Sequence, residues 1–310
     1  MKKISAALII ILLFILTGYS AKNDLPRIRD TLRYARRSGN STAAEQDHFY
    51  ALRGKNEKDE VGMLLYDKET KNSQFLFADN VYQIGLIGNK IYYRVMYQDG
   101  LFCYALDSGK RTLLLEDFQI YQIKDQSLYY TSKDSGKSYY MKDLQTGAVT
   151  EVKTENTVDS FWITDTAFYY TSDTERKLYR RPNGKEEEQL IYSVDDAAIL
   201  NVTAITGDDI AFLSAEYYDD EALLLYCETE TGKVYPQIKG DFENFGYVRN
   251  HGVTVKGSDI YAVDFEAGEV YSWGKLDQVY DYFNVMEDQI IFYKDDHPYI
   301  QDYPETANAR

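Results

Sequence analysis

Short runs in which an apolar residue is followed by aromatic residues recur about every forty residues from His48 onward. A polar loop follows each run, and no stretch in this region has the 3.6-residue periodicity of an amphipathic helix. We call these runs openers, and they begin at Phe49, Ile91, Leu128, Phe168, Ile210, Ile260 and Ile290. The steps between openers are 42, 37, 40, 42, 50 and 30 residues. A period of this length is typical of an architecture built from repeated units.

Each repeat also contains further short apolar segments. After the opener "LYYT" at Leu128 come "SYYMKDL", "AVTEV" and "FWITDT", the last of which leads to the next opener. Tight turns are expected at four glycines, where a positive φ is useful: Gly109, Gly147, Gly184 and Gly232. Four short strands per unit predict a β-meander.

The strands of this meander are apolar on both sides, so each sheet must be covered on both faces by neighbouring copies. Closing such sheets into a ring gives a β-propeller, which leaves only short edges exposed. The sequence therefore predicts an all-β fold, a propeller of four-stranded blades. Seven openers favour seven blades. Six blades also fit, because the sixth unit spans only 30 residues and the last contains two strands.

A GKS triplet at Gly136–Ser138 resembles the end of a phosphate-binding loop. Such a loop needs a glycine five residues before the Gly-Lys pair, and a helix after it. Thr131 occupies that position, and another predicted strand follows. We therefore interpret the triplet as part of a hairpin loop.

The segments "LYYTSKDSGKSYYMKDLQTG" and "FYYTSDTERKLYRRPNGKEEEQLI" resemble the YWTD repeats of low-density-lipoprotein-receptor-type propellers. They are still more similar to the repeats of a bacterial family of exported propellers of unknown function. The resemblance covers roughly residues 43 to 303, with Tyr where the receptor repeats have Trp. It implies the propeller fold, and it carries over no site residues.

The first 21 residues are expected to form a signal peptide, because Lys2 and Lys3 precede an apolar run that ends at Gly18. The stretch "LTGY" is lipoprotein-like, but Tyr19 stands where lipidation requires a cysteine. We therefore predict export across the cytoplasmic membrane without lipidation, to the cell surface or the medium. A retained signal anchor is the alternative, because six basic residues follow the apolar run: Lys22, Arg27, Arg29, Arg33, Arg36 and Arg37.

Residues 22–47 are predicted to form a short basic helix and a linker, and residues 48–310 the propeller. Residues 4–37 could associate with a membrane, because basic side chains bind anionic lipid headgroups. A linker helix without lipid contact is the other interpretation.

The net charge of −16 argues against nucleic-acid binding, because an acidic surface repels phosphate backbones. Without residues 1–37, which hold eight Lys or Arg and two Asp or Glu, the charge is −22. The 30 tyrosines agree with a strand-rich fold, since Tyr can bury its ring while its hydroxyl finds a partner.

No spacing typical of a catalytic or metal site occurs, and the three histidines are isolated in the sequence. We therefore predict no catalytic residues, no metal ligands and no cofactor. An acidic loop in the fifth unit is the candidate binding surface, because loops on a rigid scaffold often carry function. Its residues are Glu216, Tyr217, Tyr218, Asp219, Asp220 and Glu221. Ordinary solvation of these acids is the alternative.

The two cysteines, Cys103 and Cys227, lie in equivalent strands of the second and fifth units. Units three apart in a ring of six or seven are too distant for a disulfide, which needs Cα atoms within about 7 Å. We predict two thiols packed between blades. Their offsets from the turn glycines differ by one residue, which predicts opposite sheet faces.

These observations favour a non-enzymatic, extracytoplasmic propeller that binds a protein, a peptide or a cell-envelope glycan. One alternative is a propeller hydrolase or lyase with a metal or carboxylate site. Another is a membrane-anchored sensor domain whose N-terminal segment is not cleaved.

Overall fold

The computed structural model describes residues 42–303, except residues 135, 173–175, 194–196, 206–208, 217–221, 228–233, 235–237, 241–244, 249–250 and 265–266. The predicted signal peptide and most of the predicted basic helix and linker therefore lie outside the described residues. The described part of the chain contains no helix with the length and apolarity that a membrane span requires.

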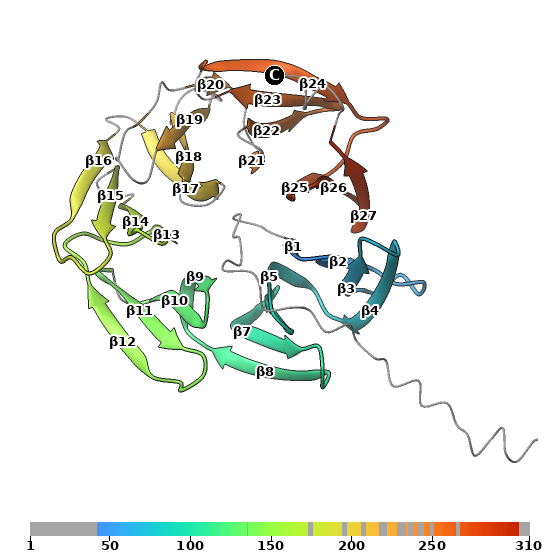
Figure 1. Ribbon diagram of the computed structural model, residues 1–310, viewed down its shortest axis with the longest axis horizontal. Coiled ribbons are helices and arrows are strands. Elements are labelled where there is room, and N and C mark those ends of the chain that lie inside the picture. Colours follow the sequence, from blue (N-terminus) through green and yellow to red (C-terminus); the bar gives the residue numbers. More distant parts are fainter. Residues whose placement is uncertain are drawn as a thin grey trace, which may run out of the picture.

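Seven antiparallel sheets are arranged in a ring around a central axis (Figure 1). Six of the sheets have four strands, and the last has three. The first three sheets consist of β1 (Ala43–Gln46), β2 (Phe49–Lys55), β3 (Val61–Asp67) and β4 (Asn72–Ala78); β5 (Val81–Ile87), β6 (Lys90–Val95), β7 (Gln98–Ala105) and β8 (Lys110–Leu115); and β9 (Phe118–Lys124), β10 (Ser127–Ser132), β11 (Ser138–Asp143) and β12 (Val149–Lys153).

The remaining sheets consist of β13 (Ser160–Ile163), β14 (Ala167–Ser172), β15 (Lys177–Pro182) and β16 (Gln189–Ser193); β17 (Ala197–Ile205), β18 (Asp209–Glu216), β19 (Ala222–Cys227) and β20 (Ile238–Gly240); β21 (Phe245–Val248), β22 (His251–Lys256), β23 (Asp259–Asp264) and β24 (Glu269–Lys275); and β25 (Tyr282–Val285), β26 (Gln289–Lys294) and β27 (His297–Asp302). The predicted all-β propeller is confirmed.

The structure corrects the sequence prediction in two places. The segment predicted to end each unit is in fact the innermost strand of the next sheet, as β5 and β9 show. The ring accordingly begins at Ala43, before the predicted start at His48. In the sixth sheet, the predicted opener at Ile260 lies in the third strand, β23, whereas the second strand is β22.

The GKS triplet lies in the hairpin between β10 and β11, as predicted, and Ser138 is the first residue of β11. A Cβ atom on Gly136 would meet nothing closer than 3.6 Å. The position therefore needs no glycine, unlike the glycines of a phosphate-binding loop.

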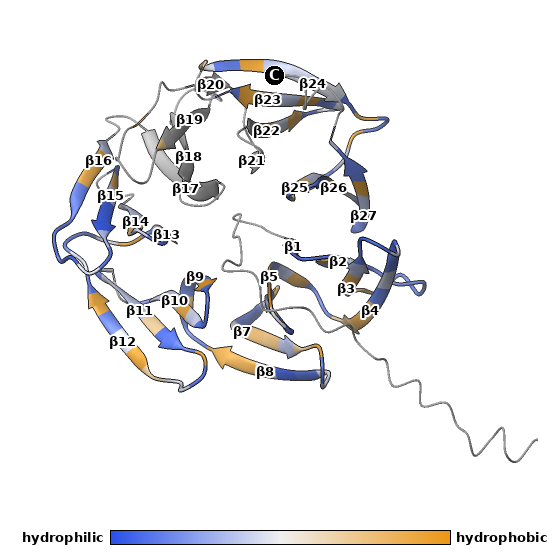
Figure 2. Cartoon of the chain, viewed as in Figure 1, coloured by the Kyte–Doolittle hydropathy of each residue, from blue (hydrophilic) through white to orange (hydrophobic). Residues whose placement is uncertain are grey.

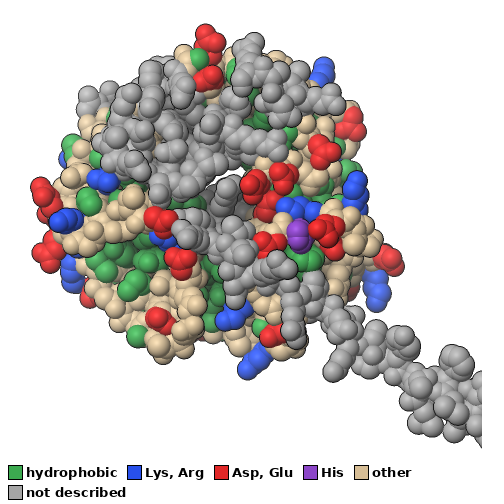
Figure 3. Space-filling view, in the orientation of Figure 1, with side chains coloured by type: hydrophobic (Ala, Val, Ile, Leu, Met, Phe, Trp, Pro, Cys, Tyr) green, Lys and Arg blue, Asp and Glu red, His purple; other side chains and the backbone are tan. Residues whose placement is uncertain are grey.

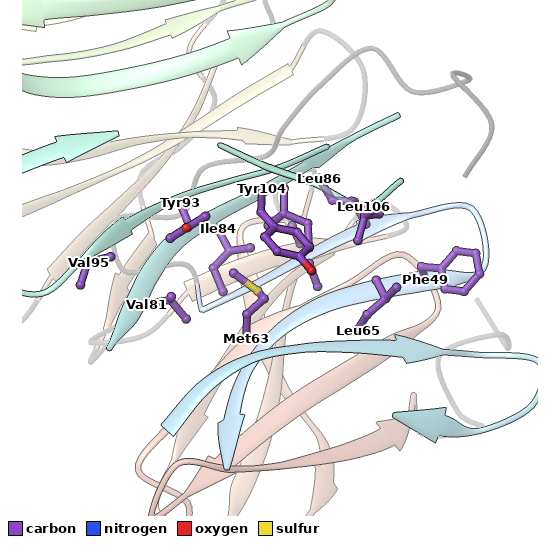
Figure 4. Packing of buried hydrophobic residues seen from close by; sticks show 13 residues of the cluster. Phe49, Met63, Leu65, Val81, Ile84, Leu86, Tyr93, Val95, Tyr104 and Leu106 are labelled. Atoms are coloured by element: carbon purple, nitrogen blue, oxygen red, sulfur yellow. The ribbon is translucent and has the colours of Figure 1, made fainter. Parts of the chain in front are cut away.

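Neighbouring sheets pack face to face through apolar side chains. In the first seam, Phe49, Met63 and Leu65 of the first sheet face Val81 and Tyr93 of the second (Figure 4). Many buried tyrosines place the hydroxyl on a partner, as predicted. Tyr93 accepts a hydrogen bond from Arg111, for example, and Tyr293 donates one to the backbone oxygen of Thr42.

The outermost strands carry apolar side chains that face solvent, and orange segments mark such positions on β8 and β12 (Figure 2). Leu113 of β8 and Val149 of β12 are both exposed. The core therefore lies between the sheets, and the rim of the ring adds little to it.

Cys103 and Cys227 are both buried thiols, which confirms the prediction that they form no disulfide. Cys103 packs with Phe118 and Tyr121 of the following sheet. Cys227 instead packs with Trp162 and Tyr169 of the preceding sheet. The two thiols thus lie on opposite faces of their sheets, as predicted.

Gly62→Ala is expected to lower the free energy of unfolding by about 2 kcal/mol, because it overpacks the space between β3 and β4. A Cβ atom at Gly62 would lie 2.1 Å from the backbone oxygen of Phe77 and 2.6 Å from a ring atom of Phe75. Urea unfolding measures the effect. Gly136→Ala is the control and should change stability by less than about 0.5 kcal/mol. Equal midpoints for the two variants would contradict the close approach at Gly62.

Candidate functional site

The acidic loop predicted as a binding surface lies almost wholly outside the described residues. Glu216 is the last residue of β18, and its backbone is paired with Ala197. Residues 217–221, which include Tyr217, Tyr218, Asp219, Asp220 and Glu221, are among those not described. The structure therefore does not test this part of the prediction.

Charged side chains gather where the last sheet meets the first, over β1 and β2 (Figure 3). Lys68 Nζ lies 2.8 Å from Glu45 Oε1 and 3.9 Å from Asp288, and it sits over the ring of Tyr50. The other oxygen of Glu45 accepts a hydrogen bond of 2.7 Å from the backbone N–H of Glu287. These groups satisfy one another across the seam, so we interpret the cluster as a contact that closes the ring.

Arg53, in β2 of the first sheet, contacts both the last sheet and the second sheet. Its guanidinium is bound to Asp296 of the last sheet, with Nε 2.7 Å from Oδ1. It also donates to Asn80 and, at 2.9 Å, to the backbone oxygen of Val81 at the start of the second sheet. The hydrogen bond from Arg53 holds the pKa of the Asp296 carboxyl below its usual value. Arg53 therefore has a structural role.

A pocket of about 430 Å³ opens at the seam between the second and third sheets. It lies where the β5–β6 turn meets the β9–β10 turn. Its lining residues are Ile87, Asn89, Lys90, Tyr92, Asp125, Gln126, Leu144 and Gln145. An adjoining pocket of about 130 Å³ shares Lys90, Tyr92 and Leu144 and adds Cys103, Ala105, Lys110, Thr112 and Leu114. We call the two together the seam pocket. Its volume falls within the range of sites that bind small organic ligands.

Polar contacts hold this seam together around the pocket. The hydroxyl of Tyr121 donates to the backbone oxygen of Gln83, and Arg94 donates to the backbone oxygen of Gln119 at 3.2 Å. At the outer strands, Lys142 Nζ donates to the backbone oxygen of Leu114 at 2.9 Å. The walls of the pocket are therefore two sheets fixed to each other, which is a rigid setting for a ligand.

One buried acceptor of the seam pocket lacks a donor. The Oδ1 atom of Asn89 is inaccessible to solvent and has no hydrogen-bond partner among the described residues. An unsatisfied buried polar atom costs about 1–3 kcal/mol. Because solvent does not reach this atom, a ligand in the pocket would not reach it either, so Asn89 contributes to the shape of the lining and not to its hydrogen bonding.

Two ammonium groups and one thiol complete the chemistry of the pocket. Lys90 and Lys110 form no ion pair with an acidic side chain in the described part of the chain. Burial raises the pKa of the Cys103 thiol, while the charge of Lys90 and a hydrogen bond with Thr112 lower it. The net shift is upward, so the thiol is protonated at neutral pH and packs as a small apolar group.

The seam pocket could not be recognised in the sequence. Asn89 and Lys90 are separated from Asp125 and Gln126 by more than thirty residues, and none belongs to a motif. The only available signal was the repeat, because both pairs stand at or beside the turn between the first two strands of successive sheets.

No family model matches the chain, and no curated protein matches it in sequence. Solved structures do match. An oligogalacturonate lyase in complex with manganese has a TM-score of 0.59 at 12% identity, over 86% of this chain and 87% of that one. An oligogalacturonate lyase from Vibrio parahaemolyticus has a TM-score of 0.59 at 12% identity, over 90% of this chain and 93% of that one.

The extracellular domain of a putative one component system from B. thetaiotaomicron also has a TM-score of 0.59 at 12% identity. It matches over 90% of this chain and 40% of that one. At identities this low, these similarities support the fold and carry no information about activity.

Proposed function

We propose that this protein is an extracytoplasmic binding propeller and that the seam pocket is its ligand site. The single observation that supports the proposal most is the pocket itself, about 430 Å³ in volume and lined by charged, amide and apolar side chains of two sheets that are fixed to each other. The ligand would come from the surroundings of an exported protein: a protein, a peptide or a cell-envelope glycan. Export and any membrane association through residues 4–37 rest on the sequence alone.

A propeller hydrolase or lyase with a metal or carboxylate site is the alternative. Among the described residues, no three His, Cys, Asp or Glu side chains are grouped so that they could hold a metal ion. Asp125 is the one acid among the residues that line the seam pocket. Binding therefore has the better support at this site.

Gln145→Trp is expected to abolish capture of the envelope ligand, because the indole would fill the mouth of the seam pocket. Gln145 is exposed and lies in the β11–β12 turn. The immobilised protein is incubated with a solubilised envelope fraction, and bound glycans and proteins are identified by mass spectrometry. We expect wild type to retain a ligand that Gln145→Trp loses about tenfold or more.

Glu69→Trp is the matched control, because Glu69 holds the equivalent position in the first sheet. Asp67 accepts hydrogen bonds from the backbone of Glu69 and Thr70, just as Asp143 does from Gln145 and Thr146. The control loses only an exposed contact with His48 and should bind like wild type. Equal capture by all three proteins, or no capture by wild type, would refute the proposed function.

A further inference from the structure

We propose that the seam pocket binds a sugar residue that carries a single carboxylate, as in a uronic-acid oligosaccharide. This inference rests on the proposed binding function and adds the chemical class of the ligand. It follows from the charges of the lining and from its amide, carboxylate and apolar side chains.

The local charge of the pocket opposes that of the whole chain. Lys90 lines both parts of the pocket and Lys110 lines the smaller part, whereas Asp125 is the one carboxylate among the lining residues. The lining thus carries one net positive charge in a protein whose net charge is −16. This local excess of positive charge would favour an anion at the pocket.

One net positive charge is matched by a monoanion. A carboxylate between Lys90 and Lys110 would be paired with both ammonium groups through charge-assisted hydrogen bonds. A phosphate carries more charge near pH 7 and would face repulsion from Asp125 across the pocket. A neutral ligand would gain nothing from the two lysines, which are exposed to water. The charge balance therefore favours a carboxylate.

The remaining polar groups suit hydroxyls. The carboxylate of Asp125 accepts hydrogen bonds. The side-chain amides of Gln126 and Gln145 both donate and accept. Each sugar hydroxyl also does both, so several hydroxyls could be satisfied in one orientation. The apolar side chains of Ile87 and Leu144 would contact the C–H groups of the ring.

The test uses oligosaccharides of glucuronate, galacturonate, mannuronate and guluronate, each with its carboxyl-reduced counterpart. Glucose 6-phosphate and an acidic tripeptide are included as probes of other anion classes. Calorimetry measures the affinity of the purified protein for each. We expect at least one uronate to bind and its reduced form to bind about tenfold or more weakly.

The double variant Lys90→Met/Lys110→Met should likewise bind the uronate about tenfold or more weakly than wild type. Lys58→Met/Lys71→Met removes the same charge from exposed positions of the first sheet and should bind like wild type. Cys103 supplies a second readout, because it lines the pocket. Bound uronate should slow its alkylation severalfold, whereas Cys227, which is 0% exposed, should stay unreactive in the folded protein.

Three results would overturn the ligand class: no binding of any uronate, equal binding of reduced and unreduced forms, or tighter binding of the phosphate or the peptide. If the uronates fail while capture of envelope material still depends on Gln145, the pocket stands and only the ligand class is wrong. If capture is also unaffected by Gln145→Trp, the proposed function falls with it.

Discussion

Replacing Gln122 by methionine is expected to lower the free energy of unfolding by about 3 kcal/mol, because two buried backbone groups lose their partners. Gln122 lies in β9 and is only 1% exposed. Its Nε2 donates to the backbone oxygen of Ile163 at 3.0 Å, and the backbone N–H of Ile163 donates to its Oε1 at 2.7 Å. One side chain thereby acts as a strand partner between the third and fourth sheets. Methionine fills the same space without either bond.

Gln119→Met is the control, since Gln119 lies in the same strand with an exposed side chain. Its effect should stay below about 0.5 kcal/mol. Urea unfolding of both variants, followed by circular dichroism, gives the comparison. Similar midpoints for the two would mean that the bond between Gln122 and Ile163 contributes little to the packing of these sheets.

Arg53→Met is expected to cost about 2–4 kcal/mol, because it leaves partly buried acceptors of two other sheets unpaired. The Arg53 side chain is 11% exposed and the Asp296 side chain 29%. Loss of the arginine breaks both bonds to Asp296 and the bonds to Asn80 and Val81. Thermal and urea unfolding at neutral pH measure the effect.

Lys153→Met is the control, because Lys153 pairs with Glu151 in an exposed contact worth at most about 1 kcal/mol. A loss for Arg53→Met no larger than for this control would refute the role of Arg53.

The difference between wild type and Arg53→Met should also depend on pH. The pKa of Asp296 is lowered in the folded state, chiefly by the hydrogen bond with Arg53. Its contribution to stability is thus complete above the pKa of the unfolded chain, which is about 4. It is lost as the pH falls through the lower folded value. The stability gap should therefore narrow in acid, and a gap that widens below pH 4 would contradict this assignment.

The sequence predicted the ring because aromatic residues open the second strand of most sheets. The openers at Phe49, Ile91 and Leu128 all fall in such strands. The sixth opener was predicted in the wrong strand. The second strand of that sheet, β22, has the sequence "HGVTVK" without Phe, Tyr or Trp, whereas "IYAV" in β23 fits the pattern. With Gly252, the second residue of β22, in place of Ile260, the last two steps are 42 and 38 residues, as regular as the others.

The binding site was beyond the reach of sequence patterns for a physical reason. Asn89 and Lys90 have a common turn sequence around them, and they meet Asp125 and Gln126 only once the third sheet packs against the second. The charge argument is also spatial, because Lys90 and Lys110 meet only through the pairing of β6, β7 and β8. The repeat in the sequence predicts a ring of sheets, but the location of the pocket depends on how neighbouring sheets pack.

The junction of the last and first sheets joins residues from the two ends of the described chain. In the described chain, each sheet is made from one continuous segment, and no strand crosses from one end of the chain into the sheet at the other. The final junction is held by hydrogen bonds between side chains. Tyr50 donates to Gln289, which is 239 residues away in the sequence, and Asn284 donates to Thr42, which is 242 residues away. Contacts so remote in the chain must overcome the entropy of closing the whole circle. They become favourable only after the intervening sheets have stacked, so we expect this junction to form last in folding.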